Sequence, residues 1–425
     1  MLRGYTRKGA WTIIDQALFA GSNFVLNFLL IQAVSGDAYG AYAVAFAIFL
    51  LFGTLHTGLL TEPMLVFGAG RFSGGFRSYL AILRRGHVFF GFAACAALAL
   101  AGLVASLFDK TMLSGSLYAA SLAQPFILYL WLMRRACYVH LKPKWSAIGG
   151  IVYAVVLLAG VVLTARLSLL TVPLVFGLMA LGSLVGGVWI ALWLRRYLPD
   201  DEGNVSKPQV LAEHRRYGGW AVATGVLAWL PSNIPFLILE FAHGSAAPGI
   251  LKAMLNFIMP AAHAYAALSI LLVPVFVRAQ SQDRLRSLVM VTAAALVVAN
   301  VVYWVLIGSF GPDLIRLLYR GKYLEYGGYL WLAGLYPIVS GVAVVVRTAL
   351  RALERPNFVF WSGVASSVCA LTLTLFLIVR FGVAGAIAGI SINMVVELTT
   401  MFIYFRKSNP AKPAFAAVAT SAPER

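Results

Sequence analysis

The chain alternates between long apolar stretches and short polar connections. Twelve stretches are each close to, or above, the roughly 20 residues that a helix needs to cross the hydrocarbon of a membrane. The first six cover residues 11–33, 39–67, 86–108, 113–133, 146–164 and 169–194. The second six cover residues 218–241, 249–277, 287–309, 329–346, 358–379 and 385–405.

These stretches are predicted to be helices, because backbone groups cannot go unpaired in lipid. The strands of a membrane barrel would alternate apolar and polar residues and would not give such continuous runs. The sequence therefore predicts an all-α polytopic membrane protein with about 12 transmembrane helices.

Basic residues fall almost entirely in every second connection. Of the 33 Lys and Arg residues, 26 lie in the two tails and in the connections on the same side, and six lie on the other side. The remaining one, Lys252, lies inside a span. An excess of Lys and Arg marks the cytoplasmic side, so both termini are predicted to be cytoplasmic.

The formal net charge of +18 does not indicate a nucleic-acid-binding protein. The positive residues lie in short connections at the membrane surface, where anionic phospholipids are their expected partners. Cys95, Cys137 and Cys369 are scattered and give neither a metal motif nor a disulfide framework. The first apolar stretch is too long for a signal-peptide core and is expected to remain as a span. The tail at 408–425, rich in Ala and Pro, is expected to be disordered.

Weak internal similarity suggests that six spans are duplicated. Residues 7–11 (RKGAW) match residues 216–220 (RYGGW), and residues 58–63 (GLLTEP) match residues 269–274 (SILLVP) at nearly the same offset. Lys142-Pro143 matches Arg355-Pro356. Six is an even number, so both halves enter from the same side as parallel repeats. Such repeats form two bundles around a central cavity and are typical of transporters.

The expected organisation is two parallel six-helix bundles joined by a linker. It consists of an N-terminal lobe at 1–194, a cytoplasmic linker at 195–217, a C-terminal lobe at 218–407 and the tail at 408–425. Gly182, Gly186, Gly385 and Gly389 are expected to serve close helix packing.

Several motifs carry a family resemblance over the whole membrane core. They are residues 35–42 (SGDAYGAY), residues 317–323 (LLYRGKY), residues 380–388 (RFGVAGAIA), and Asp15-Gln16 with residues 61–64 (TEPM). In order and spacing these resemble the multidrug/oligosaccharidyl-lipid/polysaccharide exporter superfamily, and within it the Wzx-like oligosaccharide flippases of the polysaccharide-transport branch.

The resemblance implies a transporter, not an enzyme. It would flip a polyprenyl-pyrophosphate-linked oligosaccharide from the cytoplasmic to the outer leaflet by alternating access, for cell-surface polysaccharide such as lipopolysaccharide or exopolysaccharide. The barrier it lowers is the desolvation of a polar headgroup in hydrocarbon. The implied location is the bacterial cytoplasmic (inner) membrane, where polysaccharide polymerase or assembly proteins are partners. No cofactor is expected, although H⁺ or Na⁺ could drive the cycle.

Polar residues inside spans are costly and are therefore site candidates. Asp15, Asn23 and Asn27 lie near helical spacing in the first span and could hydrogen-bond sugar hydroxyl groups from one face. Asp15 could equally cap the first turn or pair with a nearby Arg at the membrane interface.

Two carboxylates are candidates for ion coupling. Glu62 precedes Pro63, which is expected to bend the second span, and Glu397 lies in the middle of the twelfth. Each could instead pair with a basic residue. In the seventh span Pro231 and Pro235 bracket Asn233, a pattern that predicts an interrupted helix and makes Asn233 a substrate-binding candidate. The alternative is a structural kink whose backbone groups are satisfied by neighbours.

Lys252, Asn256 and His263 are expected on one face of the eighth span. A cation there would suit a pyrophosphate, or Lys252 could extend to the outer headgroups. The acidic residues at 200–202 are interpreted as a solvated loop, and His56, His87 and His140 have no spacing typical of metal ligands.

Two other functions stay open. The first is a cation-coupled exporter of small drugs from the same superfamily, which Glu62 and Glu397 leave possible. The second is a membrane-embedded sugar polymerase or ligase. The short outer connections argue against the enzyme, because they offer no convincing acid–base pair.

Overall fold

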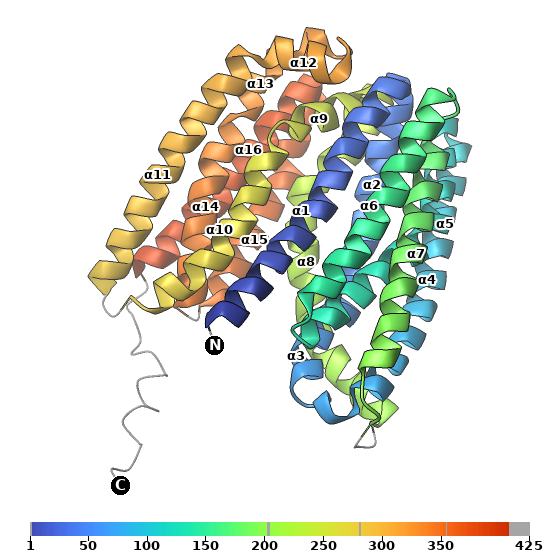
Figure 1. Cartoon of the computed structure of the whole chain (residues 1–425). Coiled ribbons are helices and arrows are strands. Elements are labelled where there is room, and N and C mark those ends of the chain that lie inside the picture. The colour runs from blue at the N-terminus through green and yellow to red at the C-terminus, as the bar shows by residue number, and fades with distance from the viewer. Residues whose placement is uncertain (1, 202–204, 280–281, 354, 408–425) are drawn as a thin grey trace. The chain divides into compact units, whose positions relative to one another are not determined.

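The computed structural model describes residues 2–201, 205–279, 282–353 and 355–407, and all regular structure in this part of the chain is helical (Figure 1). The expectation of a disordered tail at 408–425 falls outside the described residues. Contacts divide the chain into two compact units. Unit 1 comprises Met1–Ala253 and Arg316–Tyr323, and unit 2 comprises Met254–Ile315 and Leu324–Arg425. The lobes at 1–194 and 218–407 remain a prediction from the internal repeat.

Unit 1 is built from long helices with short connections. Its elements are α1 (Leu2–Ala33), α2 (Gly36–His56), the π-helix η1 (Thr57–Thr61), α3 (Glu62–Ala69), the 3₁₀ turn η2 (Ser73–Gly75), α4 (Phe76–Leu107), α5 (Thr111–Val139), α6 (Pro143–Arg166), α7 (Val172–Tyr197) and α8 (Lys207–His243). α5 lies at the centre, packed against α2, α4, α6 and α7, while α1 packs on α6 and α8 packs on α2.

Unit 2 is built in the same way around α14. Its elements are α10 (Met259–Val277), α11 (Gln282–Ser309), the 3₁₀ turn η3 (Leu324–Tyr326), α13 (Tyr329–Ala333), α14 (Leu335–Ala352), α15 (Pro356–Cys369), the π-helix η4 (Ala370–Thr374) and α16 (Leu375–Lys407). α14 packs against α10, α11 and α16. Two further helices, α9 (Ala246–Asn256) and α12 (Gly311–Tyr319), have residues in both units.

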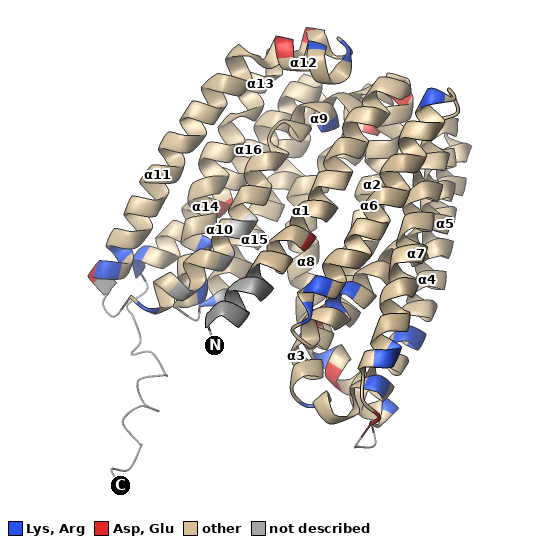
Figure 2. Cartoon of the chain, in the orientation of Figure 1, with Lys and Arg blue, Asp and Glu red and all other residues tan. Residues whose placement is uncertain are grey.

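Ten helical segments among the described residues are long and apolar enough to cross a membrane. One of them, Asn357–Lys407, covers both the eleventh and the twelfth predicted spans, and it turns sharply at Gly382 (φ 59°, ψ −131°). In each unit Lys and Arg lie mostly near helix ends, and the middles of the helices carry little charge (Figure 2). The chain is therefore an all-helical polytopic membrane protein. Twelve spans and cytoplasmic termini stay predictions.

Two predicted helix shapes are wrong. The eighth span is not one helix, because α9 ends at Asn256 and α10 begins only at Met259. The seventh span is not interrupted, because α8 continues through Pro231 and Pro235. A proline removes only one helical donor, and neighbouring side chains can satisfy the freed region of the backbone in a transmembrane helix. The Asn233 side chain also bonds within the same helix, because its Nδ2 donates to the Trp229 carbonyl at 3.1 Å.

The glycines assigned to helix packing are confirmed in that role. A Cβ on Gly186 would lie 2.8 Å from the Gly149 carbonyl oxygen, and one on Gly182 would lie 3.0 Å from that of Tyr153. At the turn around Gly382 within α16, a Cβ on Gly385 would lie 2.0 Å from the Leu377 carbonyl oxygen. A Cβ on Gly389 would lie 2.3 Å from the Thr374 methyl group. Any side chain at these positions would force the helices apart.

The repeat has a local counterpart in the backbone. Lys142, before α6, has φ −114° and ψ 56°, and Arg355, before α15, has φ −115° and ψ 54°. Each residue donates its backbone N–H to a carbonyl five residues earlier at 2.9 Å, and each precedes a helix that begins with proline. The two basic-residue–proline corners therefore have the same geometry, which supports the predicted duplication.

Candidate functional site

The most enclosed charged cluster in unit 1 surrounds Asp15 on α1. Arg134 on α5 places Nη2 2.9 Å from Asp15 Oδ2. The same oxygen accepts a hydrogen bond from the Tyr138 hydroxyl at 2.6 Å and one from the Ser146 hydroxyl at 3.0 Å. The Asp15 side chain is fully buried and that of Arg134 is 10 % exposed. Of the two alternatives for Asp15, the structure shows pairing with an arginine.

Asp15 still has one acceptor without a hydrogen bond. Its Oδ1 is buried and has no hydrogen-bond partner among the described residues. It faces Gly150 on α6, where a Cβ would lie 3.4 Å away. Buried polar atoms are normally satisfied, so this oxygen is the acceptor of the cluster that can take a further hydrogen bond.

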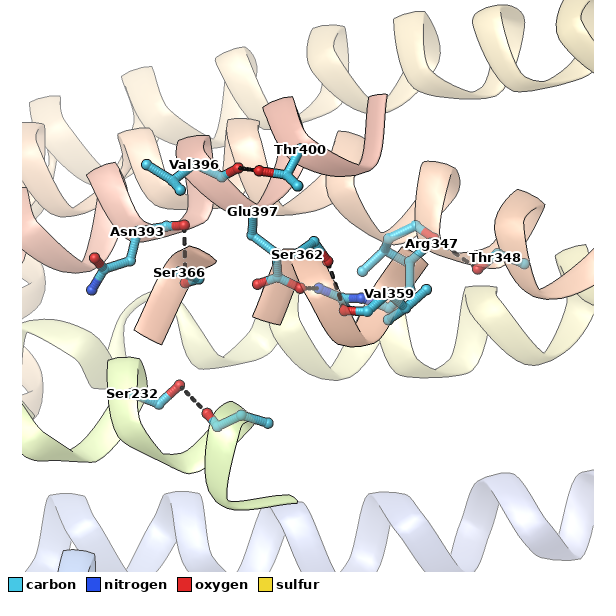
Figure 3. A network of polar contacts seen from close by, with 12 residues as sticks. Ser232, Arg347, Thr348, Val359, Ser362, Ser366, Asn393, Val396, Glu397 and Thr400 are labelled. Carbon is cyan, nitrogen blue, oxygen red and sulfur yellow. Dashed lines mark hydrogen bonds and ion pairs between the residues drawn. The ribbon is translucent and has the colours of Figure 1, made fainter. Parts of the chain in front are cut away.

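Unit 2 contains a second ion pair between helices. Arg347 on α14 places Nη2 2.5 Å from Glu397 Oε1 on α16 (Figure 3). The two side chains are 25 % and 15 % exposed. Glu397, a predicted ion-coupling carboxylate, therefore has a cationic partner, as the alternative interpretation expected.

The two arginines occupy corresponding positions in the repeat. Arg134 lies eight residues before Lys142, and Arg347 lies eight residues before Arg355. The predicted spans at 113–133 and 329–346 end just before these arginines, but α5 continues to Val139 and α14 to Ala352. The predicted spans ended too early, because an arginine paired with a carboxylate can remain inside a helix bundle.

The two asparagines of α1 do not gather around Asp15. Asn27 donates from Nδ2 to the Asn23 carbonyl at 2.7 Å and accepts from the Tyr39 hydroxyl at 3.0 Å. Asn27 is almost completely buried and Asn23 is half-buried. Asp15 contacts α5 and α6, whereas Asn27 contacts Tyr39 on α2. Roles for Asn23 and Asn27 in substrate binding remain predictions.

Glu62, the other predicted ion-coupling carboxylate, begins α3 directly after a π-helix and is exposed. Pro63 has no N–H, so the Leu59 carbonyl lacks its usual helical donor. His214 on α8 places Nδ1 2.8 Å from that carbonyl oxygen, and its Nε2 lies 2.7 Å from the Tyr79 hydroxyl. A carbonyl can only accept, so Nδ1 carries the proton and a neutral His214 accepts from Tyr79 at Nε2. π-Helical segments occur frequently at functional sites.

Lys252 on α9 lies against aromatic rings. Its Nζ is 5.3 Å from the centre of the Tyr42 ring and 4.8 Å from that of Phe46, both on α2. Among the described residues no carboxylate lies within ion-pair distance of Lys252. The two residues expected to share its face belong to unit 2. Asn256 is buried at the end of α9, and His263 is exposed on α10.

Three further polar groups inside unit 1 were missed in the sequence. His56 and His87, treated as unrelated, meet between α2 and α4 with Nε2 and Nδ1 3.1 Å apart. Glu240 on α8 is fully buried and pairs with Lys110 at 3.2 Å. Its position within the otherwise apolar run at 236–241 was a signal for an intramembrane carboxylate. Among the described residues, no group of three or more His, Cys, Asp or Glu is arranged to hold a metal ion.

The loop acids at 200–201 do not match the predicted solvated loop, and residue 202 lies outside the described residues. Asp200 forms an ion pair with Arg77. Asp201 accepts hydrogen bonds from the backbone N–H groups of Arg77 at 3.0 Å and Ser78 at 2.8 Å, at the start of α4. Carboxylates are favourable at the N-terminus of a helix, where free N–H groups and the helix dipole attract negative charge. This loop therefore caps α4.

Lys322, from the segment Arg316–Tyr323, caps the C-terminal end of α1. Its Nζ donates to the carbonyls of Ile31, Gln32 and Val34 at 2.9–3.0 Å. Burial, with a smaller contribution from the neighbouring Arg320, lowers the pKa of Lys322 below its usual value. Part of the motif at 317–323 thus has a structural function, since a C-terminal helix end favours a cation.

Solved structures of transporters share this fold. An inward-facing multidrug resistance MATE family transporter of the MOP superfamily matches with a TM-score of 0.76 and 11% identity over 96% of both chains. The lipid II flippase MurJ, in an inward closed conformation, matches with a TM-score of 0.73 and 13% identity, covering 99% of this chain and 94% of that chain.

A MOP superfamily transporter from Pyrococcus furiosus, described as having a binding pocket of reverse polarity, matches with a TM-score of 0.65 and 11% identity. The match covers 95% of this chain and 94% of that one. No protein-family model and no curated protein sequence matches the chain. At these low identities the similarity shows the fold, and the chain has the fold of the MATE transporters and of MurJ over nearly its whole length.

Proposed function

We propose that the protein is a flippase that moves a polyprenyl-pyrophosphate-linked oligosaccharide across the membrane by alternating access. The fold is shared with the lipid II flippase MurJ. The motifs at 35–42, 317–323 and 380–388 resemble those of oligosaccharide flippases. These features support a transporter for cell-surface glycan assembly in a bacterial cytoplasmic membrane.

The observation that carries the proposal is the environment of Lys252. Its ammonium group lies on the Tyr42 and Phe46 rings, and no described carboxylate neutralises it. Cations are expensive inside a membrane protein unless they pair with an anion. By contrast, Arg134, Arg347 and Lys110 each pair with an acid. An anionic pyrophosphate supplies the missing partner for Lys252.

Export of small molecules is the second candidate, because the fold is shared equally with MATE multidrug transporters. Glu62 favours it, since this exposed carboxylate follows a π-helix and could exchange a proton or a sodium ion. An uncompensated ammonium group at Lys252 does not suit an exporter of cationic drugs, because like charges repel.

The test is a flipping assay in proteoliposomes. The purified protein is reconstituted with a lipid-pyrophosphate oligosaccharide that carries a fluorescent sugar. An impermeant quencher then reports the headgroups on the outer face. Protein-dependent exposure above empty liposomes is the expected result. No exposure with several lipid-linked sugars, with or without a proton or sodium gradient, would contradict the proposal.

Lys252 is tested in the same assay with a matched control. Lys252→Gln is expected to slow flipping about 10- to 100-fold, because a hydrogen bond to a charged group contributes about 1.5–3 kcal/mol. Lys207→Gln removes the same charge from an exposed position at the start of α8 and should leave the rate unchanged. Equal rates for the two variants would remove Lys252 from the site. Gradient-driven uptake of a fluorescent cation, unaffected by Lys252→Gln, would favour the exporter.

A further inference from the structure

A groove runs along one side of unit 1, between α4 and α7 and over α5. α5 packs closely against both neighbours through glycines: Gly91 on α4 faces Pro125, and Gly187 on α7 faces Tyr129. The groove has a volume of about 700 Å³ and continues toward Arg195 in a second hollow of about 290 Å³. Tyr129 lines both hollows.

The walls of the groove are apolar and exposed. Phe92 on α4 is 75 % exposed, and Leu122 on α5 is 68 % exposed. The lining residues of α4 extend from Ala81 to Cys95, and the stretch from Arg84 to Cys95 has a length of ~16 Å at 1.5 Å per residue. This stretch is about half of the ~30 Å hydrocarbon thickness. From the level of Arg84 inward, the groove is therefore about as deep as one leaflet.

The mouth of the groove is basic. Arg84, Arg85 and Arg195 line it, and all three are exposed. In the part of the chain that the structure describes, no carboxylate lies within ion-pair distance of any of them. The Arg84 guanidinium lies 5.7 Å from the centre of the Tyr129 ring, which holds it over the groove. The nearby Arg77 is different, because it is already paired with Asp200.

We propose that this groove binds one anionic phospholipid. The phosphate lies against Arg84, Arg85 and Arg195, and the acyl chains occupy the apolar walls for the depth of one leaflet. Guanidinium groups bind phosphate with strong, often paired hydrogen bonds, and basic pockets between transmembrane helices are suited to acidic lipid headgroups. The length of the groove favours a phospholipid over a polyprenyl chain, which would extend beyond one leaflet. The inference does not depend on the identity of the transported cargo.

Lipid retention measured by native mass spectrometry tests the proposal. The full-length protein is purified from nanodiscs that contain equal amounts of phosphatidylglycerol and phosphatidylcholine. One phosphatidylglycerol is expected to remain bound preferentially. Each arginine near a membrane surface contributes about fivefold to the attraction of anionic lipid. The variant Arg84→Gln/Arg85→Gln should therefore lose the preference by about 25-fold.

The matched control is Arg215→Gln/Arg216→Gln. This variant removes the same charge from two adjacent exposed arginines of α8 outside the groove, and it should keep the preference of the wild type. Three results would overturn the proposal. They are equal retention of the two lipids by the wild type, an equal loss in both variants, and displacement of phosphatidylglycerol by an equimolar polyprenyl pyrophosphate.

A second measurement does not require the variants. A ligand that binds only the native state raises its stability in proportion to the logarithm of ligand concentration. Titrating phosphatidylglycerol into the wild type in micelles should raise its Tm progressively with the logarithm of lipid concentration above the Kd, while phosphatidylcholine should not. An identical response to both lipids would mean that the groove holds ordinary surrounding lipid only.

Discussion

The buried ion pair between Asp15 and Arg134 allows a quantitative prediction. Removing one member of a buried pair leaves an uncompensated charge and typically costs 3–5 kcal/mol. In Arg134→Met, Asp15 keeps the hydroxyl donors of Tyr138 and Ser146. We therefore expect a cost near the lower limit, ~3 kcal/mol. In Asp15→Asn, all three donors lose the carboxylate, and we expect ~5 kcal/mol.

The double variant Asp15→Asn/Arg134→Met should be less damaging than the sum of the two single changes. It leaves no net charge buried, so its cost should be ~2–3 kcal/mol, with a coupling energy larger than the ~0.5 kcal/mol scatter seen for independent sites. The free energy of unfolding is measured in detergent micelles by titration with SDS. Asp200→Asn is the control, because Asp200 is 95 % exposed in its pair with Arg77. Its cost should stay below ~1 kcal/mol.

Two results would refute this reasoning. Additive effects of Asp15→Asn and Arg134→Met would show that the two residues stabilise the fold independently. A larger loss for Arg134→Met than for Asp15→Asn would show that the two hydroxyl donors do not compensate the Asp15 carboxylate.

Two other predictions concern the helix backbone. His214→Phe should destabilise unit 1 by ~2–4 kcal/mol, because the Leu59 carbonyl and the Tyr79 hydroxyl lose a partner. The double variant Pro63→Ala/His214→Phe should recover part of this loss in thermal unfolding, because alanine at 63 restores an N–H donor for the Leu59 carbonyl. No recovery would contradict the hydrogen bond assigned between His214 and that carbonyl. Gly385→Ala should lower the free energy of unfolding by ~3 kcal/mol through overpacking. Gly177→Ala is the control, because no atom lies near its new Cβ, and it should be neutral or raise the free energy of unfolding by up to ~1 kcal/mol. Equal melting temperatures for the two alanine variants would contradict the close contact at Gly385.

The sequence predicted the fold class well, because hydrophobic length and composition are strong signals in membrane proteins. It predicted helix ends less well. Arg134 and Arg347 were placed in connections because a charged residue normally marks the end of a span. Their partners, Asp15 and Glu397, lie far away in the sequence, so the pairing that keeps them inside the bundle was not visible.

The polar contacts between helices were also hidden from sequence analysis. His56 and His87 are 31 residues apart, and Glu240 pairs with a lysine 130 residues earlier. Helical periodicity shows which residues share a face of one helix, but it does not show which helix that face meets. For the same reason Asp15 and Asn27, expected to act together, contact different neighbours.

The contact between Lys322 and the end of α1 bears on the order in which the protein is completed during synthesis. α1 leaves the ribosome well before the ammonium group that binds carbonyls at its C-terminal end, which is translated about 290 residues later. The C-terminal end of nascent α1 must therefore be satisfied by water or headgroups until Lys322 has been made. The final position of α1 is fixed late. A chain that stops before residue 322 contains every helix of unit 1 from α1 to α8, but it lacks the lysine that completes the C-terminal end of α1.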